Sequence, residues 1–159
     1  DLPIDLAGYR LVKRTALAST TDTSIKSWTA STTIPAHGFY LWANSDYTTI
    51  ATVPDATTTT TIADDNGIAL RFGPLNTGAI IDSVAWGNAQ NNFGEGSLLM
   101  STLLPEQSYE RKLWQGIACF SAQGVGELLG NGCDTNDNDS DFNVRSVSMP
   151  QNSTSTLEW

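Results

Sequence analysis

The sequence predicts an all-β fold, an antiparallel β-sandwich. Short apolar runs rich in β-branched residues recur along the chain, and turn-forming Gly, Pro, Asn and Asp separate them. Apolar residues at helical spacing are scarce. The 159 residues contain no internal repeat and no internal domain boundary. We therefore expect residues 1–159 to form one all-β domain.

The first half of the chain contains three predicted strands. Tyr9–Arg14 alternates loosely between apolar and polar side chains. Phe39–Ala43 is apolar on both faces, as in the central strand of a sandwich. Ile34–Gly38 is a predicted turn before it, because proline fixes φ and glycine tolerates a positive φ. Thr57–Thr61 is rich in threonine, which favours an edge strand.

Four further strands are predicted after Thr61. The first follows the turn Asp64–Gly67, and the second ends at Gly87–Asn88. The best helical candidate, Leu98–Leu104, is too short to change the fold class. The four strands are Ile68–Phe72, Ile80–Trp86, Tyr109–Trp114 and Phe142–Val147.

The charge of the chain argues against two classes of partner. Eight basic and seventeen acidic side chains give a net charge of −9, which opposes nucleic acid and anionic lipid. No apolar run approaches the roughly 18 residues that a membrane helix needs. The sequence also shows no signal peptide, so we expect a chain that is soluble or already processed. We expect no nucleic-acid binding and no membrane insertion.

Motifs of enzyme chemistry are missing from the sequence. A single histidine, His37, leaves no room for a histidine-rich metal centre, and it lies in a predicted turn. There is no Gly-x-Ser-x-Gly elbow, no phosphate-binding Gly-x-x-x-x-Gly-Lys loop and no Cys-x-x-Cys pair. We therefore predict that the chain is not an enzyme and has no catalytic residues.

Two cysteines, Cys119 and Cys133, lie fourteen positions apart. In an extracellular protein they would form a disulfide, whose restraint of the loop adds about 3 kcal/mol to stability. The alternative is a pair of buried thiols in a cytosolic protein. Abundant threonine, few lysines and the sequons at Asn138 and Asn152 favour export. We expect an extracellular or cell-surface location.

Asp and Asn alternate in the segment from Asp134 to Asp141, which is the candidate metal site. Carboxylate and amide oxygens at such spacing suit Ca²⁺, the one cofactor that the sequence indicates. An EF-hand is excluded, because Arg145 stands where a bidentate glutamate is needed. The alternative is a turn whose Asp and Asn oxygens accept backbone hydrogen bonds without metal. The candidate ligands are Asp134, Asn136, Asn138, Asp139 and Asp141.

A buried ion pair is predicted at Arg111, which shares strand parity with Tyr109 and should face inward. A buried guanidinium requires a carboxylate, because leaving it unpaired costs several kcal/mol. Asp82 and Asp141 are the candidate partners, and we interpret the pair as structural.

Five tryptophans allow a carbohydrate-binding function, because flat aromatic rings stack on sugars. Trp42 and Trp86 lie in the strongest predicted strands and are expected in the core. Trp28, Trp114 and Trp159 have fewer constraints and could form a sugar platform.

Seven segments in order resemble the lamin tail domain family, in its bacterial, exported branch. The resemblance implies an immunoglobulin-like antiparallel β-sandwich without catalytic activity, used for association with proteins or surfaces. The matching segments are Ile4–Leu11, Ile34–Leu41, Asp65–Leu70, Ile81–Gly87, Ser108–Lys112, Asp134–Phe142 and Pro150–Ser153.

Two departures from the family pattern affect the expected partners. The strand that usually precedes Ile4–Leu11 is missing from the sequence, and Trp114–Cys133 is longer than is typical. A sandwich without one strand has an unpaired edge, which favours a strand-complementing partner or an oligomer. We expect an extracellular interaction or structural module whose partners are other protein chains or a cell-surface component. The alternatives are a carbohydrate-binding module and a subunit of a multi-chain surface assembly.

Overall fold

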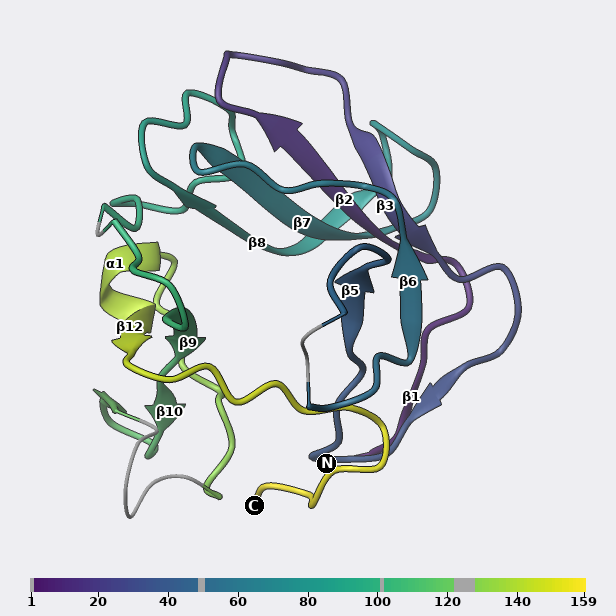
Figure 1. The fold of residues 1–159 in the computed structure, drawn as a ribbon, viewed down its shortest axis with the longest axis vertical. Coiled ribbons are helices and arrows are strands. Elements are labelled where there is room, and N and C mark those ends of the chain that lie inside the picture. Colours follow the sequence, from purple (N-terminus) through teal and green to yellow (C-terminus); the bar gives the residue numbers. More distant parts are fainter. Residues whose placement is uncertain (1, 49–50, 101, 122–127) are drawn as a thin grey trace.

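Strands account for nearly all of the regular structure. A computed structural model describes residues 2–48, 51–100, 102–121 and 128–159 (Figure 1). Within these residues the single helix, α1, covers only Asn138–Asp141, whereas twelve strands form five sheets. The predicted all-β class is therefore confirmed. No helix among the described residues has the length and apolar character needed to cross a membrane.

The largest sheet has four antiparallel strands in the order β3-β2-β7-β8. Three of its strands, β2, β7 and β8, alternate in the predicted way, and short connections join β2 to β3 and β7 to β8. The strand β3 was not predicted. Val12 lies opposite Ala69 and Leu11 opposite Leu70 in the register of the two central strands. The strands are β2 (Tyr9–Thr15), β3 (Thr23–Ser27), β7 (Asn66–Phe72) and β8 (Ala79–Trp86).

Four two-stranded sheets complete the fold. Three are antiparallel, and β5–β6 is parallel. In Figure 1 the four-stranded sheet lies at the top, β5 and β6 stand beneath it, and β9, β12 and α1 lie to the left. The pairs are β1 (Ile4–Asp5) with β4 (Thr33–Ile34), β5 (Trp42–Asn44) with β6 (Ala56–Thr58), β9 (Ser108–Arg111) with β12 (Phe142–Arg145), and β10 (Leu113–Trp114) with β11 (Cys119–Phe120).

The predicted helix over Leu98–Leu104 is wrong. The backbone N–H of Leu99 donates to Ala85 at 3.2 Å, and its carbonyl accepts from Gly87 at 2.8 Å. Leu99 therefore forms a parallel bridge with Trp86 at the edge of β8. Because these backbone groups bond to a strand, they are not available for helical hydrogen bonds.

Four predicted strands are shorter than expected: β6 ends at Thr58, β12 ends at Arg145, and long-range contacts interrupt two others. The strand at Phe39–Ala43 begins only at Trp42, because the N–H of Leu41 donates to the side chain of Asp55 at 2.7 Å. The strand at Tyr109–Trp114 is divided at Lys112. The N–H of Lys112 donates to the carbonyl of Asp141 (2.7 Å), which belongs to α1, and its carbonyl accepts the N–H of Cys133 (2.9 Å). In both places a long-range contact interrupts a locally favourable strand pattern.

The tightest part of the core covers one face of the four-stranded sheet. Val12, Ala69 and Phe93 form a cluster in which each side chain is at most 1% exposed. The guanidinium groups of Arg14 and Arg71 lie over the Phe93 ring, 4.5 and 5.4 Å from its centroid. Cation–π contact and burial thus hold both arginine stems against the apolar cluster.

The carboxylate of Asp22 neutralises part of this buried charge. It lies 2.7 Å from Nε of Arg14 and 2.6 Å from Nε of Arg71, and all three side chains are at most 5% exposed. Asn76 fixes Asp22 from the opposite side, since its Oδ1 accepts the Asp22 N–H at 2.6 Å. We did not predict this network, because Arg71 is far from Arg14 and Asp22 in sequence and no local motif connects the three.

The C-terminal segment packs against the loops around β5. Asn152 Nδ2 donates to the carbonyl of Val53 at 2.9 Å, and Ser153 donates to the Asp55 carboxylate. Trp159 lies against the ring of His37, with 4.8 Å between the ring centroids. These contacts bring the end of the chain next to β5 and β6, as Figure 1 shows.

Candidate functional site

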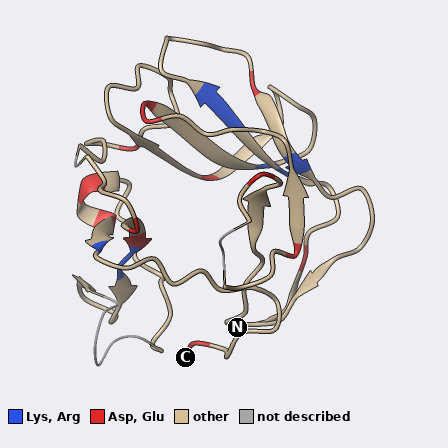
Figure 2. Cartoon of the chain, viewed as in Figure 1, with Lys and Arg blue, Asp and Glu red and all other residues tan. Residues whose placement is uncertain are grey.

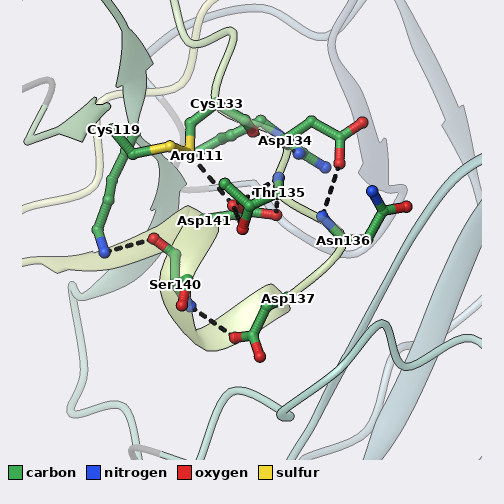
Figure 3. Close-up of a disulfide and its surroundings, with 10 residues drawn as sticks. Arg111, Cys119, Cys133, Asp134, Thr135, Asn136, Asp137, Ser140 and Asp141 are labelled. Carbon is green, nitrogen blue, oxygen red and sulfur yellow. Dashed lines mark hydrogen bonds between the residues drawn. A yellow bond between two sulfur atoms is a disulfide. The ribbon is translucent and has the colours of Figure 1, made fainter. Parts of the chain in front are cut away.

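The predicted disulfide joins Cys119 of β11 to Cys133, which precedes the acidic segment (Figure 3). Cys133 is fully buried, whereas Cys119 is half-buried. The N–H of Cys133 donates to the carbonyl of Lys112 at 2.9 Å. The disulfide therefore connects the β10–β11 hairpin to the loop that leads into α1.

Asp141 lies beside the disulfide and is fully buried. Its carboxylate accepts the N–H of Thr135 at 2.9 and 3.0 Å and the Thr135 hydroxyl at 2.6 Å. Its Oδ1 also lies 3.2 Å from the sulfur of Cys133. Asp141 thus closes the acidic segment on itself and does not pair with Arg111, which was one of its two predicted roles.

Asn138 at the start of α1 joins the acidic segment to β8. Its Oδ1 accepts the N–H groups of Ala85 and Glu95, both at 3.1 Å. Its Nδ2 donates to the carbonyl of Ser83 at 3.2 Å and lies 3.4 Å from Glu95 Oε2. Because the side chain is 0% exposed and its polar atoms all have partners, Asn138 serves a structural role. The acceptor asparagine of its sequon is therefore buried in the folded chain, although Asp139 and Ser140 are exposed.

Asp137 caps the N-terminus of α1. Its carboxylate accepts the N–H of Ser140 at 3.0 Å and the N–H of Ser97 at 3.1 Å. These two backbone hydrogen bonds lower the pKa of Asp137, because they favour its charged form. Asp134 accepts the N–H of Asn136 in the same way, at 3.2 Å. The pattern of Asp and Asn therefore supplies the backbone of this turn with acceptors.

The five predicted calcium ligands are placed in two environments. Asn138 and Asp141 are fully buried and bonded to protein donors, whereas Asp134, Asn136 and Asp139 are exposed. Among the described residues, the one metal-like grouping of His, Cys, Asp or Glu combines Asp141 with the two cysteines, whose sulfurs bond to each other. Calcium binding stays a prediction, and the geometry favours the alternative of a hydrogen-bonded turn.

Arg111 pairs with Asp82 and not with Asp141. Its Nη2 lies 2.8 and 2.7 Å from the two Asp82 oxygens, and its Nη1 donates to the carbonyl of Cys133 at 2.7 Å. The pair is less buried than expected, since the Asp82 side chain is 43% exposed. The reason is that residues 79–81, the first part of β8, are exposed. The guanidinium also covers the ring of Phe142, 4.7 Å from its centroid.

Glu95 is a charged residue of this region that the sequence did not indicate. Burial raises its pKa, and the carboxylates of Asp82 and Asp134 add to the rise. The Ser83 hydroxyl, 3.2 Å from Glu95 Oε1, and the charge of Arg111 oppose it. No local motif surrounds Glu95, so only the folded chain shows that it joins this acidic group.

A second candidate site is a pair of adjacent cavities that meet at Ile62. One has a volume of 520 Å³ and is lined by β5, and the other has a volume of 440 Å³ and is lined by the end of β8. We call this space the central groove. It is defined by Trp42, Tyr47, Ile62, Trp86, Met100 and Tyr109.

The walls of the central groove expose apolar area. Tyr47 is 58% exposed, Met100 63% and Ile62 40%. Trp42 and Trp86, which we expected in the core, are half-buried and line the groove, whereas Trp28 is buried at 7% exposure. Solvent-accessible aromatic and methionine side chains in a concave surface are typical of a binding site.

Comparisons with known proteins leave these sites without a precedent. No protein-family model matches the chain, and searches of curated proteins and of solved structures find no match. The lamin tail resemblance therefore stays a prediction from the sequence.

Proposed function

We propose that the chain is an immunoglobulin-like β-sandwich of the lamin tail kind that acts outside the cytoplasm as a non-catalytic module. Its task is to associate with another polypeptide through the central groove. The observation that carries this proposal is the composition of the groove: exposed Tyr, Met and Ile side chains beside two half-buried tryptophans. Protein interfaces are enriched in these residue types.

The contacts around the disulfide support a structural role for the acidic segment. The side-chain oxygens of Asp137, Asn138 and Asp141 accept hydrogen bonds from backbone N–H and hydroxyl groups, which stabilises the turn. The disulfide suits an exported protein, because such bonds persist in oxidising compartments. The groove, which contains solvent-accessible apolar side chains, is therefore the better candidate for binding.

The carbohydrate-binding alternative rests on Trp114 and Trp159, which are 47% and 73% exposed. Trp114 belongs to β10, and Trp159 stacks against His37 near the C-terminus. Neither of them lines the central groove. Substitution of Trp114 and Trp159 should therefore remove sugar binding at such a platform and leave binding in the central groove unchanged.

A selection from a displayed library of random nine-residue peptides tests the proposal. We expect enriched peptides whose binding is lost in Ile62→Asp, because the substitution places a charge in the apolar groove. Ile80→Asp is the matched control, since Ile80 is also 40% exposed but lies on β8 away from the groove lining. Failure to enrich any peptide, or equal binding to both variants, would contradict the proposal.

A further inference from the structure

We infer that the occupant of the central groove is an extended, apolar polypeptide segment that carries lysine or arginine and pairs with the free edge of β5. This inference rests on the proposed function and specifies the partner. Three observations support it: the backbone of β5, the apolar lining and the charge of the groove.

Among the described residues, β5 pairs with another strand on one edge, and on the opposite edge the carbonyl of Asn44 accepts the N–H of Tyr47 at 3.0 Å. The carbonyl of Leu41 accepts the N–H of Ala56 at 3.2 Å, and the N–H of Ser45 donates to Thr58 at 2.8 Å, so the odd-numbered residues face β6. Because backbone groups alternate along a strand, the N–H and C=O of Trp42 point away from β6. Within the described residues no strand pairs with this edge of β5.

The larger cavity of the groove lies at β5. Its lining includes residues 41–44 together with Glu106, Ser148 and Pro150. In Figure 1, β6 lies on one side of β5, and β8 and β9 lie beyond the other. A segment paired with Trp42 would bring alternate side chains against Ile62 and its apolar neighbours, which is the geometry of β-strand addition.

The charge of the groove selects the kind of segment. Its described lining contains three acidic residues, Glu106, Asp64 and Asp65, and no Lys, Arg or His. Among the described residues none of the three takes part in an ion pair. Figure 2 shows the basic residues mainly on the strands. Lys13 lines a cavity that shares Asp64 and Asp65 with the groove, and Arg111 and Arg145 line another cavity that shares Ser148 and Pro150 with it. A segment with Lys or Arg complements the acidic residues of the groove and also the net charge of −9 of the whole chain.

The composition of the selected peptides tests the charge complementarity. We expect the nine-residue peptides that depend on Ile62 to be enriched in Val, Ile, Lys and Arg. Replacing their basic residues by Glu should weaken binding about tenfold or more at low salt. The variant Glu106→Gln should reduce this difference. Peptides that depend on Ile62 but show no basic preference would overturn this part while leaving the proposed function standing.

Hydrogen exchange tests the strand pairing. Saturation with a selected peptide should slow exchange of the Trp42 amide by about tenfold or more, because it gains a hydrogen bond. The Ala43 amide is the internal control, since it already faces β6. Peptides N-methylated at alternate positions should lose binding in one parity and keep it in the other. Unchanged Trp42 exchange, or equal binding of both parities, would overturn strand addition.

Discussion

Asp22 and Arg14 form an ion pair of 2.7 Å in which neither side chain is more than 5% exposed. The same carboxylate also neutralises Arg71, so that one buried anion serves two buried cations. Further guanidinium N–H groups donate to backbone carbonyls, Arg14 to Thr20 at 3.1 Å and Arg71 to Gly78 at 2.6 Å, and Arg14 also donates to the side chain of Asn92. The burial of Arg14 and Arg71 therefore depends on the charge of Asp22.

Substitution of Asp22 should destabilise the fold strongly. Asp22→Asn leaves two buried guanidinium groups without a counter-charge, and we expect a loss of about 3–5 kcal/mol in the free energy of unfolding. Asp82→Ala is the matched control. It also removes an Arg–Asp pair, but this pair is half-exposed, and the expected loss is about 1 kcal/mol or less. Denaturant unfolding measures both, and equal losses would contradict the assignment.

Loss of the Asn138 side chain should separate α1 from β8. Asn138→Ala leaves the buried N–H groups of Ala85 and Glu95 without their acceptor, and each unsatisfied group costs about 1–3 kcal/mol. Asn136→Ala provides a comparison in the same segment, because the Asn136 side chain is exposed. Thermal unfolding of both variants provides the measurement. A lower unfolding midpoint for Asn136→Ala than for Asn138→Ala would refute the structural role of Asn138.

Reduction of the disulfide should lower stability by about 3 kcal/mol, the value expected for a loop of fourteen residues. The double variant Cys119→Ser, Cys133→Ser should reproduce this loss and should be insensitive to a dithiol reductant. Unfolding with and without reductant measures the effect. A chain whose unfolding midpoint is the same in both conditions would show that the restraint adds nothing.

Calcium should leave the unfolding midpoint unchanged. The oxygens of Asp137, Asn138 and Asp141 already accept protein hydrogen bonds, so that binding a cation would require breaking them. Thermal unfolding with millimolar calcium and with chelator provides the measurement. A higher midpoint in calcium that is lost in Asp134→Asn would instead support the predicted calcium loop.

Stability should depend on pH in two opposite ways. Burial and nearby carboxylates raise the pKa of Glu95 above 4.5, so the folded chain holds its proton more tightly and gains stability as pH falls through that pKa. Burial raises the pKa of Asp55, but hydrogen bonds from Ser153 and Leu41 outweigh it and lower the pKa below 3.8. The stability from Asp55 is present above pH 4 and is lost as pH falls further.

Single variants separate the two contributions to this pH dependence. Glu95→Gln should remove the gain in mildly acidic solution, and Asp55→Asn should reduce the loss below pH 4. Unfolding free energies measured from pH 7 to pH 2 test both. A wild-type curve without any gain as pH falls toward 4.5, identical to that of Glu95→Gln, would show that Glu95 is not perturbed.

The sequence by itself determined the fold class, three of the four strands of the main sheet and the cysteine pair. Strands β2, β7 and β8 follow their predicted ranges closely, because alternation and flanking turns act over a few residues. The acidic segment was also identified from the sequence, although its alternation of Asp and Asn fits a turn and a metal loop equally well. Local chemistry could not choose between these two.

Only the tertiary structure decided which distant groups meet. Leu99 joins β8 instead of a helix, Asp22 pairs with arginines from two strands, and Trp42 lines a groove instead of the core. Each outcome depends on burial and on hydrogen-bond partners far away in the chain. A local sequence pattern states what a residue prefers, whereas the packing of the whole chain decides which of its competing preferences is met.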